Sequence, residues 1–238
     1  MKLSFSTRGW EHLDWDNLVD KVCEVRFSGI EVYNVMSATG WTEPSGPFHK
    51  YSIVSTYRRL VERKLVIPCF DSSCDISADD RGMIEEVSSL IRLAADMKCP
   101  YVSVCAKSNV HEVISRNLSE LTVVAREHNV TILIKTKGIY SDTSLLRDLM
   151  NDFACDQLGA LWDVHHTFRD NSETPAQSIT NLGAYVRQVH MKDSYDAETY
   201  NLIGEGNLPV RKVMEALSSI DYDGFISLEW KPEWMEDM

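Results

Sequence analysis

An apolar run that ends in a charged or imidazole side chain recurs along the second half of the chain. Residues 158–162 are apolar and Asp163 follows them, and similar runs end at Lys135, His190 and Glu229. The polar residues that end these runs are 28, 27 and 39 residues apart, and a βα unit takes roughly 30 residues. Carboxylates are rarely buried without a partner, so polar groups at the ends of buried strands indicate a shared site.

The whole chain alternates between short apolar stretches and segments of helical periodicity. Strands are predicted at residues 2–6, 29–34, 66–70, 101–105, 130–134, 158–166, 185–190 and 224–229. Helices are predicted at about 14–27, 50–64, 79–97, 110–127, 142–151, from 174 onward and at 209–218. This repeat predicts an α/β fold with a parallel sheet, and eight strands predict one closed (β/α)8 TIM barrel over residues 1–238. An open doubly wound sheet is the alternative, but no G-x-G-x-x-G follows the first strand.

The end of the chain leaves little room for a last helix. Only about nine residues follow Glu229, and Pro232 is among them. The barrel is therefore expected to lack a full eighth helix, which would leave the first and last strands partly uncovered. Three explanations are open: residues 1–238 are a fragment of a longer multidomain chain, a homodimer partner or additional C-terminal domain covers the face, or the barrel is naturally trimmed.

The charge and the cysteines limit the partners and the compartment. A net charge of −12 argues against nucleic acid and against anionic membranes as ligands. The sequence has no basic-then-apolar leader, and no apolar run approaches the ~20 residues of a membrane span. The six cysteines form no C-x-x-C pair and are predicted to be reduced thiols. A cytoplasmic protein that binds a small molecule is the expectation.

Four motifs near the predicted strand ends carry a family resemblance. They are WDVHH at 162–166, VHMKD at 189–193, GEG at 204–206 and SLEW at 227–230. With them the chain resembles the xylose isomerase-like TIM barrels, the superfamily of sugar phosphate isomerases and epimerases. The resemblance implies a sugar or sugar phosphate substrate and a divalent metal (Mn, Mg, Co or Zn) held by Asp163, His190 and Glu229. It also implies proton transfer next to a carbonyl through an enediolate, with Glu229 as an acid–base group and His166 at the substrate.

The chain departs from the family pattern at Lys135, where the family has a metal-binding Glu. A lysine ammonium has no lone pair for a metal. In one interpretation the metal is lost and Lys135 pairs with Asp163 and Glu229. In a second, Asp163, His190 and Glu229 still hold the metal and Lys135 turns toward the substrate. In a third, Lys135 is itself catalytic with a pKa depressed by burial, although its acidic neighbours would oppose that.

Further candidates for substrate contact are Arg8, Glu31, Lys137 and Lys192, each of which could instead form a structural ion pair. Two functions follow. The first is an isomerase or epimerase, whose activity depends on which of the three interpretations of Lys135 holds. The second is a metal-free, non-catalytic ligand-binding or scaffolding barrel within a larger protein. A DNA-repair endonuclease, which shares the barrel, is disfavoured by the acidic charge and by the few histidines.

Overall fold

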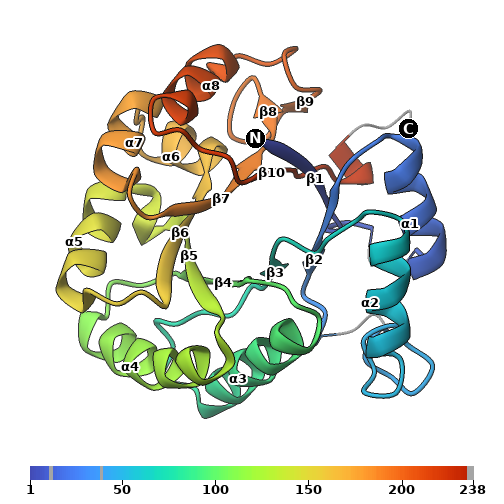
Figure 1. The fold of residues 1–238 in the computed structure, drawn as a ribbon. Helices are drawn as coiled ribbons and strands as arrows, with labels where there is room; N and C mark the ends of the chain where they lie inside the picture. The colour runs from blue at the N-terminus through green and yellow to red at the C-terminus, as the bar shows by residue number, and fades with distance from the viewer. Residues whose placement is uncertain (11–12, 38–39, 235–238) are drawn as a thin grey trace.

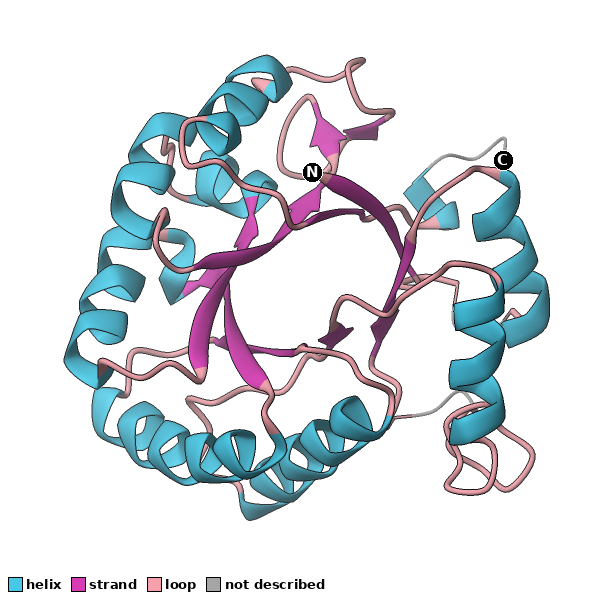
Figure 2. Ribbon diagram, viewed as in Figure 1, coloured by secondary structure: helices cyan, strands magenta, loops and turns pink. Residues whose placement is uncertain are grey.

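The computed structural model describes residues 1–10, 13–37 and 40–234. Eight parallel strands close into a barrel (Figure 2), which confirms the predicted TIM barrel. In spatial order they are β1 (Lys2–Ser6), β10 (Phe225–Leu228), β7 (Val186–Met191), β6 (Leu158–Asp163), β5 (Thr131–Gly138), β4 (Tyr101–Ala106), β3 (Phe70–Asp71) and β2 (Gly29–Tyr33). The carboxyl ends of all eight strands therefore meet at one end of the barrel.

The helices lie outside the ring of strands (Figure 1). They are α1 (Trp15–Glu24), α2 (Ile53–Glu62), α3 (Arg81–Asp96), α4 (His111–His128), α5 (Thr143–Phe153), α6 (Val164–Asp170), α7 (Pro175–Leu182) and α8 (Val210–Ser218). Asp14 caps α1 as predicted, because its carboxylate accepts the backbone N–H groups of Asp16 and Asn17. The apolar core lies between these helices and the strands, where β-branched and leucine side chains from both are buried.

Strand β3 is shorter than the predicted strand at 66–70. Pro68 has no backbone N–H, so it interrupts the ladder. The carbonyls of Val66 and Cys69 still accept the N–H groups of Ile30 and Val32, which keeps the segment beside β2.

Two elements in the loops at the carboxyl ends of the strands were not predicted. Residues 164–166, predicted as the end of the strand that starts at 158, instead begin the helix α6, which directly follows β6. A small antiparallel pair, β8 (Asp193–Ser194) with β9 (Tyr200–Asn201), follows β7. Both place polar groups at the rim where the strands end.

After β10 the described chain forms one 3-10 helix, η2 (Pro232–Trp234), and residues 235–238 lie outside the described part. Leu3 on β1 is 52% exposed, and no α-helix follows β10 in the described part of the chain to cover that strand. No helix in the described part of the chain has the length and apolar character needed to cross a membrane.

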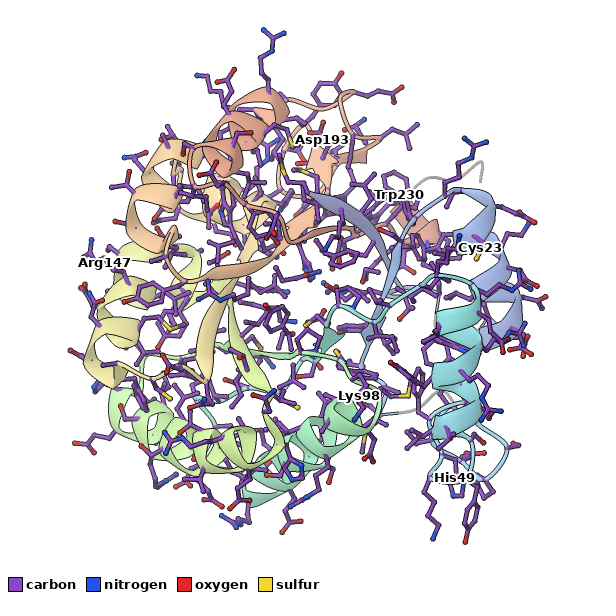
Figure 3. All side chains as sticks on the ribbon, viewed as in Figure 1. Cys23, His49, Lys98, Arg147, Asp193 and Trp230 are labelled. Atoms are coloured by element: carbon purple, nitrogen blue, oxygen red, sulfur yellow. The ribbon has the colours of Figure 1, made fainter. Side chains whose placement is uncertain are left out.

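Side chains fill the middle of the ring (Figure 3), and on the side of β1, β2, β7 and β10 they are polar. Glu31 Oε2 accepts hydrogen bonds from Gln188 Nε2 and from Ser227 Oγ, both at 2.8 Å. Ser4 Oγ lies 2.7 Å from Ser227 Oγ. This buried network links four strands and fixes the orientation of Glu31.

Candidate active site at the carboxyl end of the barrel

Asp163, His190 and Glu229 lie together where β6, β7 and β10 end. These are neighbouring strands, and the register places Asp163 beside His190. The three side chains are buried, and one ligand atom from each lies within 4.8 Å of the others. The structure thus brings together the three residues that the family resemblance proposed as a set.

Lys192 lies between the two carboxylates of that set. Its Nζ is 2.8 Å from Asp163 Oδ2 and also contacts Glu229 Oε2. Arg8 binds the other oxygen of Glu229, Oε1. Burial alone would raise the pKa of both carboxyl groups, but the ammonium of Lys192 outweighs this and lowers both. Asp163 and Glu229 are therefore ionised and firmly paired.

Lys135 does not pair with Asp163 and Glu229, which corrects the first interpretation above. Its Nζ donates to Asp71 Oδ1 at 2.7 Å and to the carbonyl of Ser72 at 2.6 Å. Asp71 ends β3, and its buried carboxylate needs a cation that Lys135 reaches across β4. Burial would lower the pKa of Lys135, but the charge of Asp71 raises it above its usual value. A raised pKa does not fit the third interpretation, in which burial depresses it.

Glu31 is not at a substrate position but inside the barrel beside His190. The distance from His190 Nε2 to Glu31 Oε1 is 2.6 Å, and both side chains are buried. Burial by itself lowers the pKa of His190, whereas the carboxylate of Glu31 raises it, with a net result of about 9.

The adjacent histidines on α6 point to different places, and His166 faces the site as predicted. His166 Nδ1 lies 2.7 Å from Asp170 Oδ2, one helical turn on, and its Nε2 lies 3.7 Å from Asp163 Oδ2. His165 instead lies 3.0 Å from Ser194 Oγ, and its ring stacks on Tyr200.

Lys137 is half-buried and, among the described residues, has no ion-pair or hydrogen-bond partner. It lies two residues beyond Lys135 on β5, so both side chains point into the barrel. Burial and the positive charges of Arg8 and Lys192 lower the pKa of Lys137. Among the described residues, Lys137 is therefore the lysine near Arg8, Lys135 and Lys192 whose ammonium is available to a bound ligand.

Two functional positions, Asp71 and Asp170, escaped the sequence reasoning, and Asp193 of the VHMKD motif has a role in a loop. Asp71 ends a predicted strand in the sequence, a signal that could have added it to the set. Asp170 lies four residues after His166, a spacing that brings two side chains together only in a helix, and no helix was predicted there. Asp193, labelled in Figure 3, is buried and accepts the backbone N–H groups of Ser194, Gly204, Gly206 and Leu208. It organises the loop that holds the GEG motif.

Asp163, His190 and Glu229 are ligand types of a divalent metal, and buried clusters of this kind hold metals in proteins. Here each of the four carboxylate oxygens already has a donor. Lys192 and Arg8 supply three of them, and the backbone N–H of His166 supplies the fourth, to Asp163 Oδ1. Asp163, His190 and Glu229 can hold a metal only if Lys192 moves away, because its ammonium already neutralises the two carboxylates that a metal ion would bind.

The protein is thus a closed (β/α)8 barrel with a charged internal site. Carboxylate, imidazole and ammonium groups gather there at the carboxyl ends of the strands. The chain belongs to the xylose isomerase-like TIM barrel family, whose sequence model matches residues 12–238. An uncharacterized protein of Methanocaldococcus jannaschii is 28% identical over 198 residues, which are 78% of this chain and 62% of that protein. The chain thus spans less than two thirds of the length of this relative.

Solved structures share the fold over nearly the full chain. The probable 3-DHS dehydratase AsbF of Bacillus anthracis, involved in petrobactin synthesis, has a TM-score of 0.80 at 18% identity, covering 100% of this chain and 94% of its own. The IOLI protein with a bound zinc atom gives 0.80 at 16%, covering 98% and 91%. A D-tagatose 3-epimerase-like protein gives 0.76 at 21%, covering 98% and 92%. At these identities the likeness shows the fold alone.

Proposed function

We propose that the chain is an isomerase- or epimerase-like enzyme that moves a proton next to the carbonyl of a sugar or another small polyhydroxylated compound. The observation that carries this proposal is His166, which Asp170 holds and whose Nε2 faces Asp163 at the carboxyl end of the barrel. Structures with the same fold include proteins named as D-tagatose 3-epimerase-like and as a probable 3-DHS dehydratase.

In this proposal His166 is the base, because the carboxylates that relatives would use are not free. Asp163 and Glu229 are tied to Lys192 and Arg8, and Lys135 replaces the second carboxylate. His166 Nε2 takes the proton from the carbon, while Asp170 accepts the Nδ1–H and holds the ring.

The negative charge that develops on the carbonyl oxygen then meets the ammonium of Lys137, which has no other partner among the described residues. Lys137 passes a proton to this oxygen and takes the proton of the neighbouring hydroxyl, so that return of the carbon-derived proton from His166 to the neighbouring carbon gives isomerisation. If the same carbon instead receives a solvent proton on its other face, and His166 releases the abstracted proton to solvent, the result is epimerisation.

The test is exchange of substrate C–H protons with deuterated solvent, followed by NMR for a panel of trioses, pentoses and hexoses with and without phosphate. We expect exchange with at least one compound, and we expect His166→Gln to slow it by about 10²–10⁴-fold, the usual contribution of a positioned base. His165→Gln is the matched control and should retain the rate within about threefold. Exchange that survives His166→Gln undiminished would contradict the assignment.

A second function, a non-catalytic ligand-binding barrel, is favoured by one observation. Lys135, Lys192 and Arg8 compensate the buried carboxylates Asp71, Asp163 and Glu229 without any added ion. Calorimetry with the same compounds separates the two functions. A compound that saturates the protein but shows no C–H exchange supports binding alone.

A further inference from the structure

Three buried ligand atoms inside the barrel have no hydrogen-bond partner, and they lie close together. They are Glu31 Oε1 on β2, Asp71 Oδ2 on β3 and His190 Nε2 on β7. The three residues are 0%, 1% and 1% exposed, and one ligand atom from each lies within 4.8 Å of the others. Glu31 Oε1 and His190 Nε2 form an ion pair at 2.6 Å without the alignment of a hydrogen bond, which leaves Asp71 Oδ2 with neither a hydrogen bond nor an ion pair. Buried polar atoms without partners are rare because they are costly.

The rest of each carboxylate is firmly held, so the free oxygens are fixed in direction. Glu31 uses its other oxygen, Oε2, for Gln188 and Ser227. Asp71 uses Oδ1 for Lys135, at 2.7 Å, and for the Ser103 hydroxyl. Each side chain therefore presents one committed oxygen and one free oxygen toward His190.

The neighbouring set differs in this respect. Asp163 and Glu229 have donors on all four oxygens, and Lys192 bridges them. His190 belongs to both sets by distance. The unsatisfied atoms thus lie on the β2–β3 side of His190, away from the residues that the family resemblance assigns to a metal.

We propose that Glu31, Asp71 and His190 bind one divalent metal ion of the zinc or manganese class. Two carboxylate oxygens and one imidazole nitrogen suit these ions. With bonds of about 2.1 Å, ligands of one ion lie about 3–4 Å apart, and one ligand atom from each of the three residues lies within 4.8 Å of the others. A metal would displace the proton of His190, and the two carboxylates and Lys135 then sum to one negative charge, which favours a cation. His166 and Lys137 are not members of this site, so the proposal is independent of the proposed function.

The test measures metal affinity rather than activity. Protein stripped with EDTA is titrated with Zn²⁺ or Mn²⁺ in equilibrium dialysis, and bound metal is measured by elemental analysis. We expect one equivalent in the unaltered protein. Glu31→Gln and Asp71→Asn should each raise the Kd at least about 100-fold, because loss of an outer partner alone costs about 10–100-fold. Asp163→Asn is the matched control and should change the Kd less than about threefold.

A variant that gains affinity guards against mere unfolding. Lys135→Met removes the cation beside Asp71 and should lower the Kd about 10-fold or more, a change that a damaged fold cannot produce. In thermal melts, added metal should raise the Tm of the unaltered protein and of Lys135→Met. The rise should be larger for Lys135→Met, because that variant binds the metal more tightly. Failure of the unaltered protein to retain metal would overturn the proposal, with His190 then a protonated partner of Glu31. Loss of metal in Asp163→Asn but not in Glu31→Gln would also overturn it and assign the ion to the neighbouring set.

Discussion

Lys192 supplies the positive charge for two buried carboxylates at once. Its Nζ contacts Asp163 and Glu229, and the side chains of all three residues are at most 3% exposed. Pairs buried to this extent add little net stability compared with an apolar core. Removing one partner is nevertheless strongly unfavourable, because an uncompensated charge stays behind.

Lys192→Met should therefore lower the free energy of unfolding by about 3–5 kcal/mol, the range for breaking a buried pair. The double variant Lys192→Met/Asp163→Asn should recover part of this loss, because one of the two stranded charges is gone. Urea unfolding followed by circular dichroism measures both. Lys137→Met, a neighbouring lysine without an ion-pair partner among the described residues, is the control and should cost less than about 1 kcal/mol. Equal losses for Lys192→Met and Lys137→Met would show that the pairing is unimportant.

At the scale of elements, the hairpin of β8 and β9 depends on one buried side chain. Asp193 accepts four backbone N–H groups, two of them from the glycines of the GEG motif. A Cβ at Gly206 would lie 2.2 Å from Asp193 Oδ1, so the loop packs directly on the carboxylate. The GEG motif thus serves the loop that borders the site, through its backbone.

Asp193→Asn should loosen this hairpin, because an amide offers one acceptor oxygen in place of two charged ones. We expect a stability loss of about 1–3 kcal/mol and faster amide hydrogen exchange at residues 200–208, measured by mass spectrometry. Asp196→Asn in the same hairpin makes the same change at an exposed acceptor of the backbone N–H groups of Glu198 and Thr199 and should have a smaller effect. Unchanged exchange at residues 204–208 in Asp193→Asn would contradict the role.

At the scale of the whole molecule, the buried charges predict how stability depends on pH when divalent metal is absent. Asp71, Asp163 and Glu229 have lowered pKa values, so their contribution is complete above the unfolded values near 4 and is lost as the pH falls further. The pKa of His190 is raised from 6.5 to about 9, so its contribution is complete below pH 6.5 and is lost as the pH rises to 9.

Stability should therefore be highest between about pH 5 and 6.5 and fall on both sides. The alkaline fall due to His190 alone is up to about 3 kcal/mol, from a shift of about 2.5 pKa units. Urea unfolding in EDTA at a series of pH values measures it, and His190→Asn should flatten the slope between pH 6.5 and 9. A slope that is the same in this variant would assign the alkaline fall to other groups.

Periodicity in the sequence determined most of the barrel. Alternation of apolar runs and helical segments gave the parallel sheet, and the polar residues at the ends of runs placed Asp163, His190 and Glu229 together, because adjacent parallel strands end at the same edge. The departures are local. Pro68 shortened β3, and α6 formed where an extended run was predicted, because Asp163 both ends β6 and caps that helix.

Only the tertiary structure decided which cation pairs with which carboxylate. One of the three interpretations paired Lys135 with Asp163 and Glu229, yet Lys135 binds Asp71, and Lys192 is the lysine that pairs with Asp163 and Glu229. Such pairings depend on contacts across several strands and on the differing reach of long side chains, neither of which leaves a periodic signal in the sequence. The sequence by itself determined that charged groups would gather at the carboxyl ends of the strands. Packing of the closed barrel determined their partners, because a buried charge pairs with whichever opposite charge the surrounding strands bring within reach.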